Sequence, residues 1–139
     1  MNEKYEFTDK LSVTDYLRLR AEAKFRALAT EQAQAGLDNA YANIAVLCGG
    51  ETVGMARLLW DGSYCAYLTD VVVTEEHRHN GLASQMVERL MEKLRTEKKE
   101  GWEIKIHLLA CPDKEGFYER FGFKARPCDG AGAAMDIWL

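Results

Sequence analysis

The 139-residue sequence lacks the features that mark several protein classes. It has no excess of positive charge, because 18 Lys and Arg residues stand against 22 Asp and Glu residues. Nucleic-acid binding is therefore not expected. No apolar run approaches the roughly 20 residues that span a bilayer, and the N-terminal residues carry no apolar secretion signal. We expect a cytoplasmic protein that binds neither nucleic acid nor membrane.

The four cysteines form no metal-binding motif. They are widely separated, with no Cys-x-x-Cys or His-x-x-His spacing of the kind found in zinc sites. In the absence of a secretion signal we expect reduced thiols, which are most often buried and structural. No metal ion is expected.

Proline is also scarce, with two residues, and no repeat or low-complexity stretch interrupts the chain. The length fits one compact domain, so we expect a single domain over residues 1–139. The hydrophobic fraction of 47% is enough for a core of ordinary size.

The hydrophobic pattern predicts a mixed fold. Strand-like segments occur at residues 5–7, 43–48, 52–60, 64–73, 104–110, 122–124 and 135–138. Helix-like segments occur at residues 12–36, with Gly36 ending or interrupting the helical region, and at residues 82–95 and 114–120. We therefore predict an α+β fold, a mixed α/β layer in which helices flank a predominantly antiparallel sheet of six to seven strands.

Residues 70–84 are the most informative stretch, because a Val-rich strand runs through a short loop into a long helix. The first turn of a helix has unpaired backbone N–H groups and a dipole that favours anions. Gly81 and Ala83 are small enough to let a diphosphate approach the backbone. By itself, such a junction is more often a plain structural turn. Neither G-x-x-x-x-G-K-[ST] nor G-x-G-x-x-G is present.

Residues 78–83, Arg-His-Asn-Gly-Leu-Ala, resemble the pyrophosphate loop [QR]-x-x-G-x-[GA] of the GNAT N-acetyltransferase family. Residues 117–123, Phe-Tyr-Glu-Arg-Phe-Gly-Phe, resemble the family's second signature. Order and spacing agree with the family, and the resemblance covers nearly the whole chain. It implies a GNAT-like sheet that splays open at the cofactor site, with acetyl-coenzyme A as co-substrate.

The resemblance also implies the cofactor contacts. The main chain of Val71 and Val73 would pair with the pantetheine arm as an added strand does. The groups that would hold the pyrophosphate are Arg78, the peptide N–H groups of His79, Asn80, Gly81 and Ala83, and the helix start at Ser84. Family members often have an asparagine just after the next strand, where this sequence has Cys111-Pro112-Asp113, so this contact is not predicted.

Tyr118 matches the family tyrosine that protonates the departing thiolate. A phenol with a pKa of about 10 can donate to the thiolate of a thiol whose pKa is roughly 8.5. The alternative is that Tyr118 only packs the short helix against the sheet. Cys111 is a rival nucleophile, without an evident His–Cys motif.

No general base can be named from the sequence. Tyr67 occupies the position of the glutamate that related enzymes use. Asp70 is nearby, but its parity along the strand points it to the opposite face, and its role is either structural or in acceptor binding. His77, His79 and His107 are each able to relay protons.

The acceptor is not identified by the sequence either. An anionic acceptor would suit the basic residues Arg18, Arg20, Arg26 and Arg57. A cationic acceptor would suit the acidic residues Asp15, Glu22 and Asp61. Aromatic residues available to line a pocket are Trp60, Tyr64, Tyr67 and Trp138.

We therefore expect an acetyltransferase that moves an acetyl group from acetyl-coenzyme A to a small-molecule primary amine, by direct attack in a ternary complex. Two alternatives stay open: an acetyl-coenzyme A sensor or interaction module without turnover, and an enzyme that acetylates protein amines. The apolar residues 135–139 permit a homodimer of the kind that GNAT domains form through their last strands.

Overall fold

The computed structural model describes residues 4–139 and divides them into two compact units, residues 4–107 and residues 108–139. The single domain expected over residues 1–139 stays a prediction. Among the described residues, no helix combines the length and the apolar character needed to cross a bilayer.

The first unit contains β1 (Tyr5–Thr8), α1 (Val13–Glu22), α2 (Thr30–Asn39), β2 (Ala42–Cys48), β3 (Glu51–Trp60), β4 (Cys65–Val73), the 3₁₀ turn η1 (Glu75–His77), α3 (Leu82–Glu97) and β5 (Lys105–His107). The second unit contains α4 (Glu115–Glu119).

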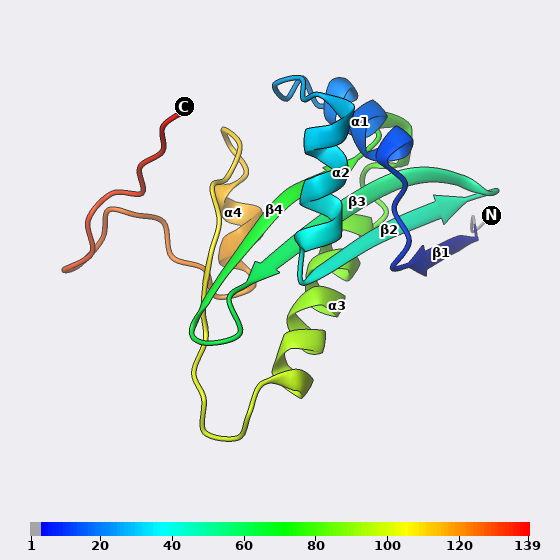
Figure 1. The fold of residues 1–139 in the computed structure, drawn as a ribbon. Helices are drawn as coiled ribbons and strands as arrows, with labels where there is room; N and C mark the ends of the chain where they lie inside the picture. Colours follow the sequence, from blue (N-terminus) through cyan, green and yellow to red (C-terminus); the bar gives the residue numbers. More distant parts are fainter. Residues whose placement is uncertain (1–3) are drawn as a thin grey trace. The chain divides into compact units, whose positions relative to one another are not determined.

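The five strands form one sheet in the order β1-β2-β3-β4-β5. Neighbouring strands are antiparallel except β4 and β5, which are parallel. Helices α1 and α2 cover one face of this sheet and α3 covers the other (Figure 1). The predicted α+β class with a predominantly antiparallel sheet is confirmed.

Helix α3 packs through one apolar stripe. Leu82, Met86, Leu90 and Leu94 recur every four residues and are at most 3% exposed. Each such side chain contributes about 1.5–3 kcal/mol when it leaves water. This periodicity fixes which side of α3 faces the sheet, and it therefore helps to position the loop that leads into the helix.

The helical region near the N-terminus ends differently from the prediction. Ser12 caps α1, since its hydroxyl accepts the Asp15 N–H at 3.1 Å. Gly36, however, lies inside α2. A Cβ at Gly36 would lie 3.6 Å from Nη1 of Arg57, which donates to the Gly36 carbonyl at 2.8 Å. This distance is an ordinary van der Waals contact, so the contact with Arg57 does not require glycine at this position. The prediction that Gly36 ends or interrupts the helical region was wrong.

The predicted strand count of six to seven was also wrong, because residues 4–139 form one sheet of five strands. β5 is limited to Lys105–His107 instead of residues 104–110. Within the described second unit, residues 122–124 and 135–138 form no strand, and the isolated bridge between Cys128 and Ala131 is the pairing found there. A short alternation of apolar and polar residues predicts which side of a strand would be buried, but it does not show that a partner strand exists. A strand without a partner is not stable alone.

Candidate functional site

The loop between β4 and α3 presents a run of unpaired backbone donors. Within residues 4–139, no acceptor is found for the N–H groups of residues 79–84. The first paired N–H of this segment belongs to Gln85, which donates to the Gly81 carbonyl at 3.1 Å. No side chain caps the helix at Gly81. Consecutive N–H groups at a helix start form an anion site.

The backbone of this loop reaches its shape through two left-handed residues. His79 has φ 66° and Gly81 has φ 73°, both in the region that ordinary side chains disfavour. The predicted phosphate donors, at residues 79–81, 83 and 84, lie together in this run. The N–H group of Leu82 belongs to the same run and was not predicted, because the sequence motif marks small residues rather than main-chain direction.

Two side chains hold the loop in place. The Asn80 amide donates to the carbonyls of His77 at 3.0 Å and Arg78 at 3.2 Å. The Tyr5 hydroxyl and His77 Nδ1 share a hydrogen bond of 3.0 Å, which fastens the loop to β1. The structure thus gives His77 a positioning contact in addition to the relay role considered from the sequence.

The second half of β4 has an open edge. The Thr74 N–H donates to Val53 on β3 at 2.9 Å, so the alternation along the strand points the main-chain groups of Val73 and Val71 away from β3. On that side β5 ends at His107, opposite Tyr67. Within the first unit, β4 beyond Tyr67 therefore has no strand partner on this edge, as the predicted splay requires.

Arg78 lies at the end of the same edge. Its Nε donates to the Val73 carbonyl at 3.1 Å, so the side chain turns back along β4 while its guanidinium stays exposed. The carbonyl of Val73 is therefore partly occupied. The edge still offers the Val73 N–H and both main-chain groups of Val71 to an extended ligand.

Tyr118 lies on α4 in the second unit and is half-buried. Its ring contacts Phe117 and Phe123 edge-on, at centroid distances of 4.9 and 6.1 Å. Burial, and then the charge of the nearby Cys111, raise the pKa of Tyr118 to about 12. The hydroxyl has no hydrogen-bond partner among residues 4–139. It is therefore a protonated donor at neutral pH.

A bulge in β4 changes the direction of Asp70. Val72 pairs with Met55 and Thr69 with Arg57, so Asp70 and Val71 together stand opposite Ala56. Asp70 has φ 56°, and its carboxylate lies on the face that α1 covers. Counting parity from Tyr67 predicted the opposite face. That expectation was wrong because the extra residue resets the alternation.

Asp70 binds three side chains at once. Its carboxylate accepts the Tyr16 hydroxyl at 2.6 Å, Arg20 Nη1 at 2.8 Å and Arg57 Nε at 2.9 Å. The Asp70 side chain is 6% exposed, and each guanidinium-bearing side chain is 11% exposed. Both carboxylate oxygens are engaged, so Asp70 has a structural role. It is not an available base.

Replacing Asp70 by asparagine is expected to destabilise the protein by about 3 kcal/mol, because two partly buried guanidinium groups would lose their counter-charge. Urea denaturation measures the loss. The control is Glu92→Gln, which removes an exposed ion pair with Arg95 and should cost at most about 1 kcal/mol. Equal small losses in the two variants would show that the cluster around Asp70 contributes little.

The remaining candidates for proton relay and acceptor binding do not gather into one site. His107 Nδ1 lies 3.2 Å from the Ala66 carbonyl, and His79 is exposed in the loop. Arg18 pairs with Asp15 at 3.3 Å and with Glu22 at 3.1 Å, so these charges offset one another on α1. No general base is assigned.

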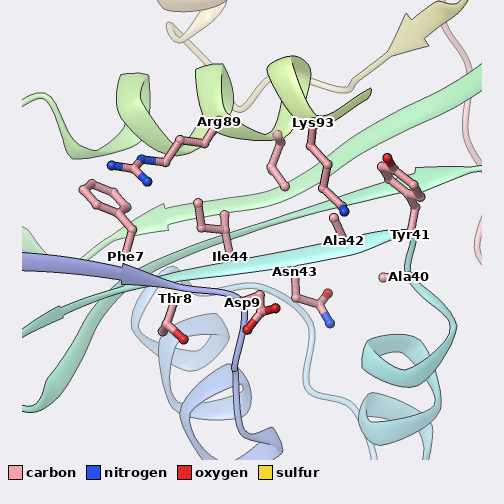
Figure 2. A pocket seen from close by; sticks show the side chains of 11 residues that line it. Phe7, Thr8, Asp9, Ala40, Tyr41, Ala42, Asn43, Ile44, Arg89 and Lys93 are labelled. Atoms are coloured by element: carbon pink, nitrogen blue, oxygen red, sulfur yellow. The ribbon is translucent and has the colours of Figure 1, made fainter. Parts of the chain in front are cut away.

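One cavity of about 460 Å³ lies against α3 at the end of β1. In Figure 2, Arg89 and Lys93 extend from α3 toward the sheet, and Arg89 lies above the Phe7 ring. The distance from Arg89 Cζ to the centroid of that ring is 4.3 Å. The strands that line it are β1 and β2, so β3 separates it from β4. It is therefore not adjacent to the open edge of β4.

A second cavity, of about 470 Å³, lies between α2 and the β3–β4 part of the sheet. Its wall includes Arg57, Trp60, Asp61 and Tyr67.

Among the residues that the structure describes, no three His, Cys, Asp or Glu side chains gather as metal ligands would.

Comparison with family models identifies one family. The family model described as an acetyltransferase (GNAT) domain matches residues 40–125. A comparison with curated protein sequences gives no match. Many solved structures share the fold.

Three of these structures come from different organisms. A probable acetyltransferase from methicillin-resistant Staphylococcus aureus has a TM-score of 0.83 at 23% identity, with 96% of this chain and 100% of that chain covered. A GNAT family acetyltransferase from Streptococcus pneumoniae has a TM-score of 0.74 at 18% identity, with 98% and 96% covered. Glucosamine-6-phosphate N-acetyltransferase from Arabidopsis thaliana has a TM-score of 0.73 at 15% identity, with 99% of each chain covered.

Proposed function

The chain belongs to the GNAT acetyltransferase family, and on this premise we propose that it acetylates the primary amine of a small molecule, using acetyl-coenzyme A. The observation that carries the proposal is the run of unpaired N–H groups at residues 79–84, directly after the open edge of β4. The Arabidopsis neighbour, by its name, acts on an amino sugar phosphate, so this fold serves a small amine in at least one protein.

The donor end of the site fits the predicted cofactor residues. The N–H groups of His79, Asn80, Gly81, Ala83 and Ser84 would bind the diphosphate. Arg78 would add positive charge beside them. The main chain of Val71 and Val73 would pair with the pantetheine arm, because these groups point to an edge that has no strand in the first unit.

The thioester of bound acetyl-coenzyme A supplies an activated acetyl group. The reaction forms a bond between the amine nitrogen and the acetyl carbon and breaks the carbon–sulfur bond. Tyr118 would donate its phenolic proton to the departing sulfur, the surplus amine proton would leave to solvent, and a proton from solvent would then restore the phenol. With its pKa raised to about 12, Tyr118 keeps its proton at neutral pH and can donate a hydrogen bond to the departing sulfur.

We expect amine-dependent release of free thiol from acetyl-coenzyme A, measured with a thiol-reactive chromophore over a panel of small amines and lysine peptides. Saturable release with small amines supports the proposal. Release with peptides alone would instead identify a protein acetyltransferase. Coenzyme A binding without thiol release for any amine would identify a sensor, and the proposed reaction would be wrong.

A further inference from the structure

We propose that the cavity between α2 and the β3–β4 face receives the acceptor and selects small amines that carry an anionic group, with Arg57 as the residue that binds this group. This inference rests on the proposed function and names its substrate class. The cavity volume of about 470 Å³ suits a small molecule.

The cavity lies where the sheet begins to open. Ala66 and Tyr67 line it, and they pair with Ile106 and His107 at the end of the β4–β5 ladder. Beyond this point β4 has no partner on that edge within the first unit. An acceptor in the cavity therefore lies beside the edge of β4 to which the proposed function assigns the pantetheine arm.

Arg57 is held rigidly, with one nitrogen left over. Nε donates to Asp70 at 2.9 Å and Nη1 donates to the Gly36 carbonyl at 2.8 Å. No partner for Nη2 exists among residues 4–139. The buried side-chain atoms without a partner in that range are Arg20 Nε and Asn43 Oδ1, so Nη2 is reached by solvent. Since Arg57 lines the cavity, this nitrogen is a fixed donor for a ligand.

The charge of the cluster favours an anion. Two guanidinium groups, on Arg20 and Arg57, share the single carboxylate of Asp70, which leaves one positive charge. These side chains are 6–11% exposed, so the charge is screened less than it would be at the surface. A carboxylate or phosphate at Nη2 would complete the balance.

The opposing carboxylate in the cavity lies apart from Arg57. Asp61 follows Arg57 by four residues, just after the end of β3 at Trp60, a distance of roughly 13 Å between Cα atoms. Its Oδ1 accepts the N–H groups of Ser63 at 2.8 Å and Cys65 at 3.3 Å. Asp61 therefore stabilises the β3–β4 turn and leaves the Arg57 end of the cavity electropositive.

Strand geometry also sets the spacing of the acceptor's groups. Leu59 pairs with Tyr67, and Arg57 precedes Leu59 by two residues, about 7 Å along the strand. The anionic group should therefore lie about this far from the amine that attacks beside Tyr67. Matched amines that fit are 5-aminopentanoate with pentylamine, and 4-aminobutyl phosphate with 4-aminobutanol.

The test compares kcat/KM within each matched pair, which separates a carboxylate ligand from a phosphate ligand. We expect the anionic member of at least one pair to be preferred about 10- to 100-fold, as a hydrogen bond to a charged group provides. Arg57→Met should remove the preference through a raised KM. Asp70 then still pairs with Arg20 at 2.8 Å, so the fold should be retained.

The ratio of kcat/KM between the anionic and the neutral amine of a pair distinguishes a loss of anion binding from a general loss of structure. A variant that only loosens the fold lowers both members together and leaves the ratio unchanged. Arg18→Met is the matched control, because Arg18 lies on α1 and does not line the cavity. No preference in the unaltered protein, or a preference that survives Arg57→Met, would overturn the inference.

If no amine is acetylated, the proposed function fails, and calorimetric binding of the same four amines in the presence of coenzyme A decides the inference. Preferential binding of an anionic member that is lost in Arg57→Met supports it. Equal binding within both pairs overturns it.

Discussion

Replacing Gly81 by glutamate is expected to weaken coenzyme A binding about 1,000-fold, close to 4 kcal/mol. Two effects add. Gly81 has φ 73°, where a side chain costs about 1–2 kcal/mol and would shift the loop backbone. The new carboxylate would also stand among the unpaired N–H groups of residues 79–84 and occupy the place of the diphosphate. Isothermal calorimetry with coenzyme A measures the loss.

Gly101→Glu is the matched control for backbone strain. Gly101 has φ 83°, and a Cβ there would meet no atom within 4 Å. It lies beyond the other end of the 16-residue α3, roughly 24 Å from Gly81 along the helix axis. Both variants should lose similar stability, but only Gly81→Glu should lose the ligand. If the two variants bind coenzyme A alike, the diphosphate is not held by this loop.

Removing the Tyr118 hydroxyl with phenylalanine is expected to lower kcat by about 10²- to 10⁴-fold, the range that a positioned general acid supplies. Coenzyme A binding should stay within about twofold, because the ring and its contacts with Phe117 and Phe123 are kept. Tyr41→Phe removes a hydroxyl that donates to Glu97 and should leave turnover unchanged. Full activity of the Tyr118 variant would reduce this residue to a packing role.

The pH profile gives a second measure of Tyr118. The acid is active while protonated, so its contribution is present at low pH and is lost as pH rises through the pKa. With that pKa raised to about 12, the tyrosine should cause no fall in rate below about pH 11. An alkaline fall near pH 9 that disappears in Tyr118→Phe would contradict this assignment.

The elements that the sequence predicted well are those governed by short-range pattern. The stripe of Leu82, Met86, Leu90 and Leu94 specified α3 because each residue faces the same side of one helix. The strands predicted at residues 43–48 and 52–60 were likewise local, since they and the Gly49-Gly50 turn between them are contiguous. The position of the loop at residues 78–81 was predictable for the same reason, since the loop joins a strand and a helix that are contiguous in sequence.

The features that were missed depend on distant partners. The bulge at Asp70 exists only through the register with β3, which a single strand does not encode. Tyr16 and Asp70 are 54 residues apart, so no spacing rule connects them. The strands expected at residues 122–124 and 135–138 failed for the complementary reason. Met135 and Ile137 alternate as strand residues do, yet they are 90% and 83% exposed, without a ladder to join.

Because the β4–β5 ladder is short, β5 can separate from β4 more easily than the other strands can separate from one another. β5 is held to β4 by three residue pairs, whereas β3 holds β4 along most of its length. The buried core draws its strand residues from β2, β3 and β4 and none from β5. Fraying of β5 would therefore break few bonds and leave the hydrophobic interior closed. The strand pairing with the fewest residue pairs therefore lies beside the edge of β4 that we propose for the pantetheine arm.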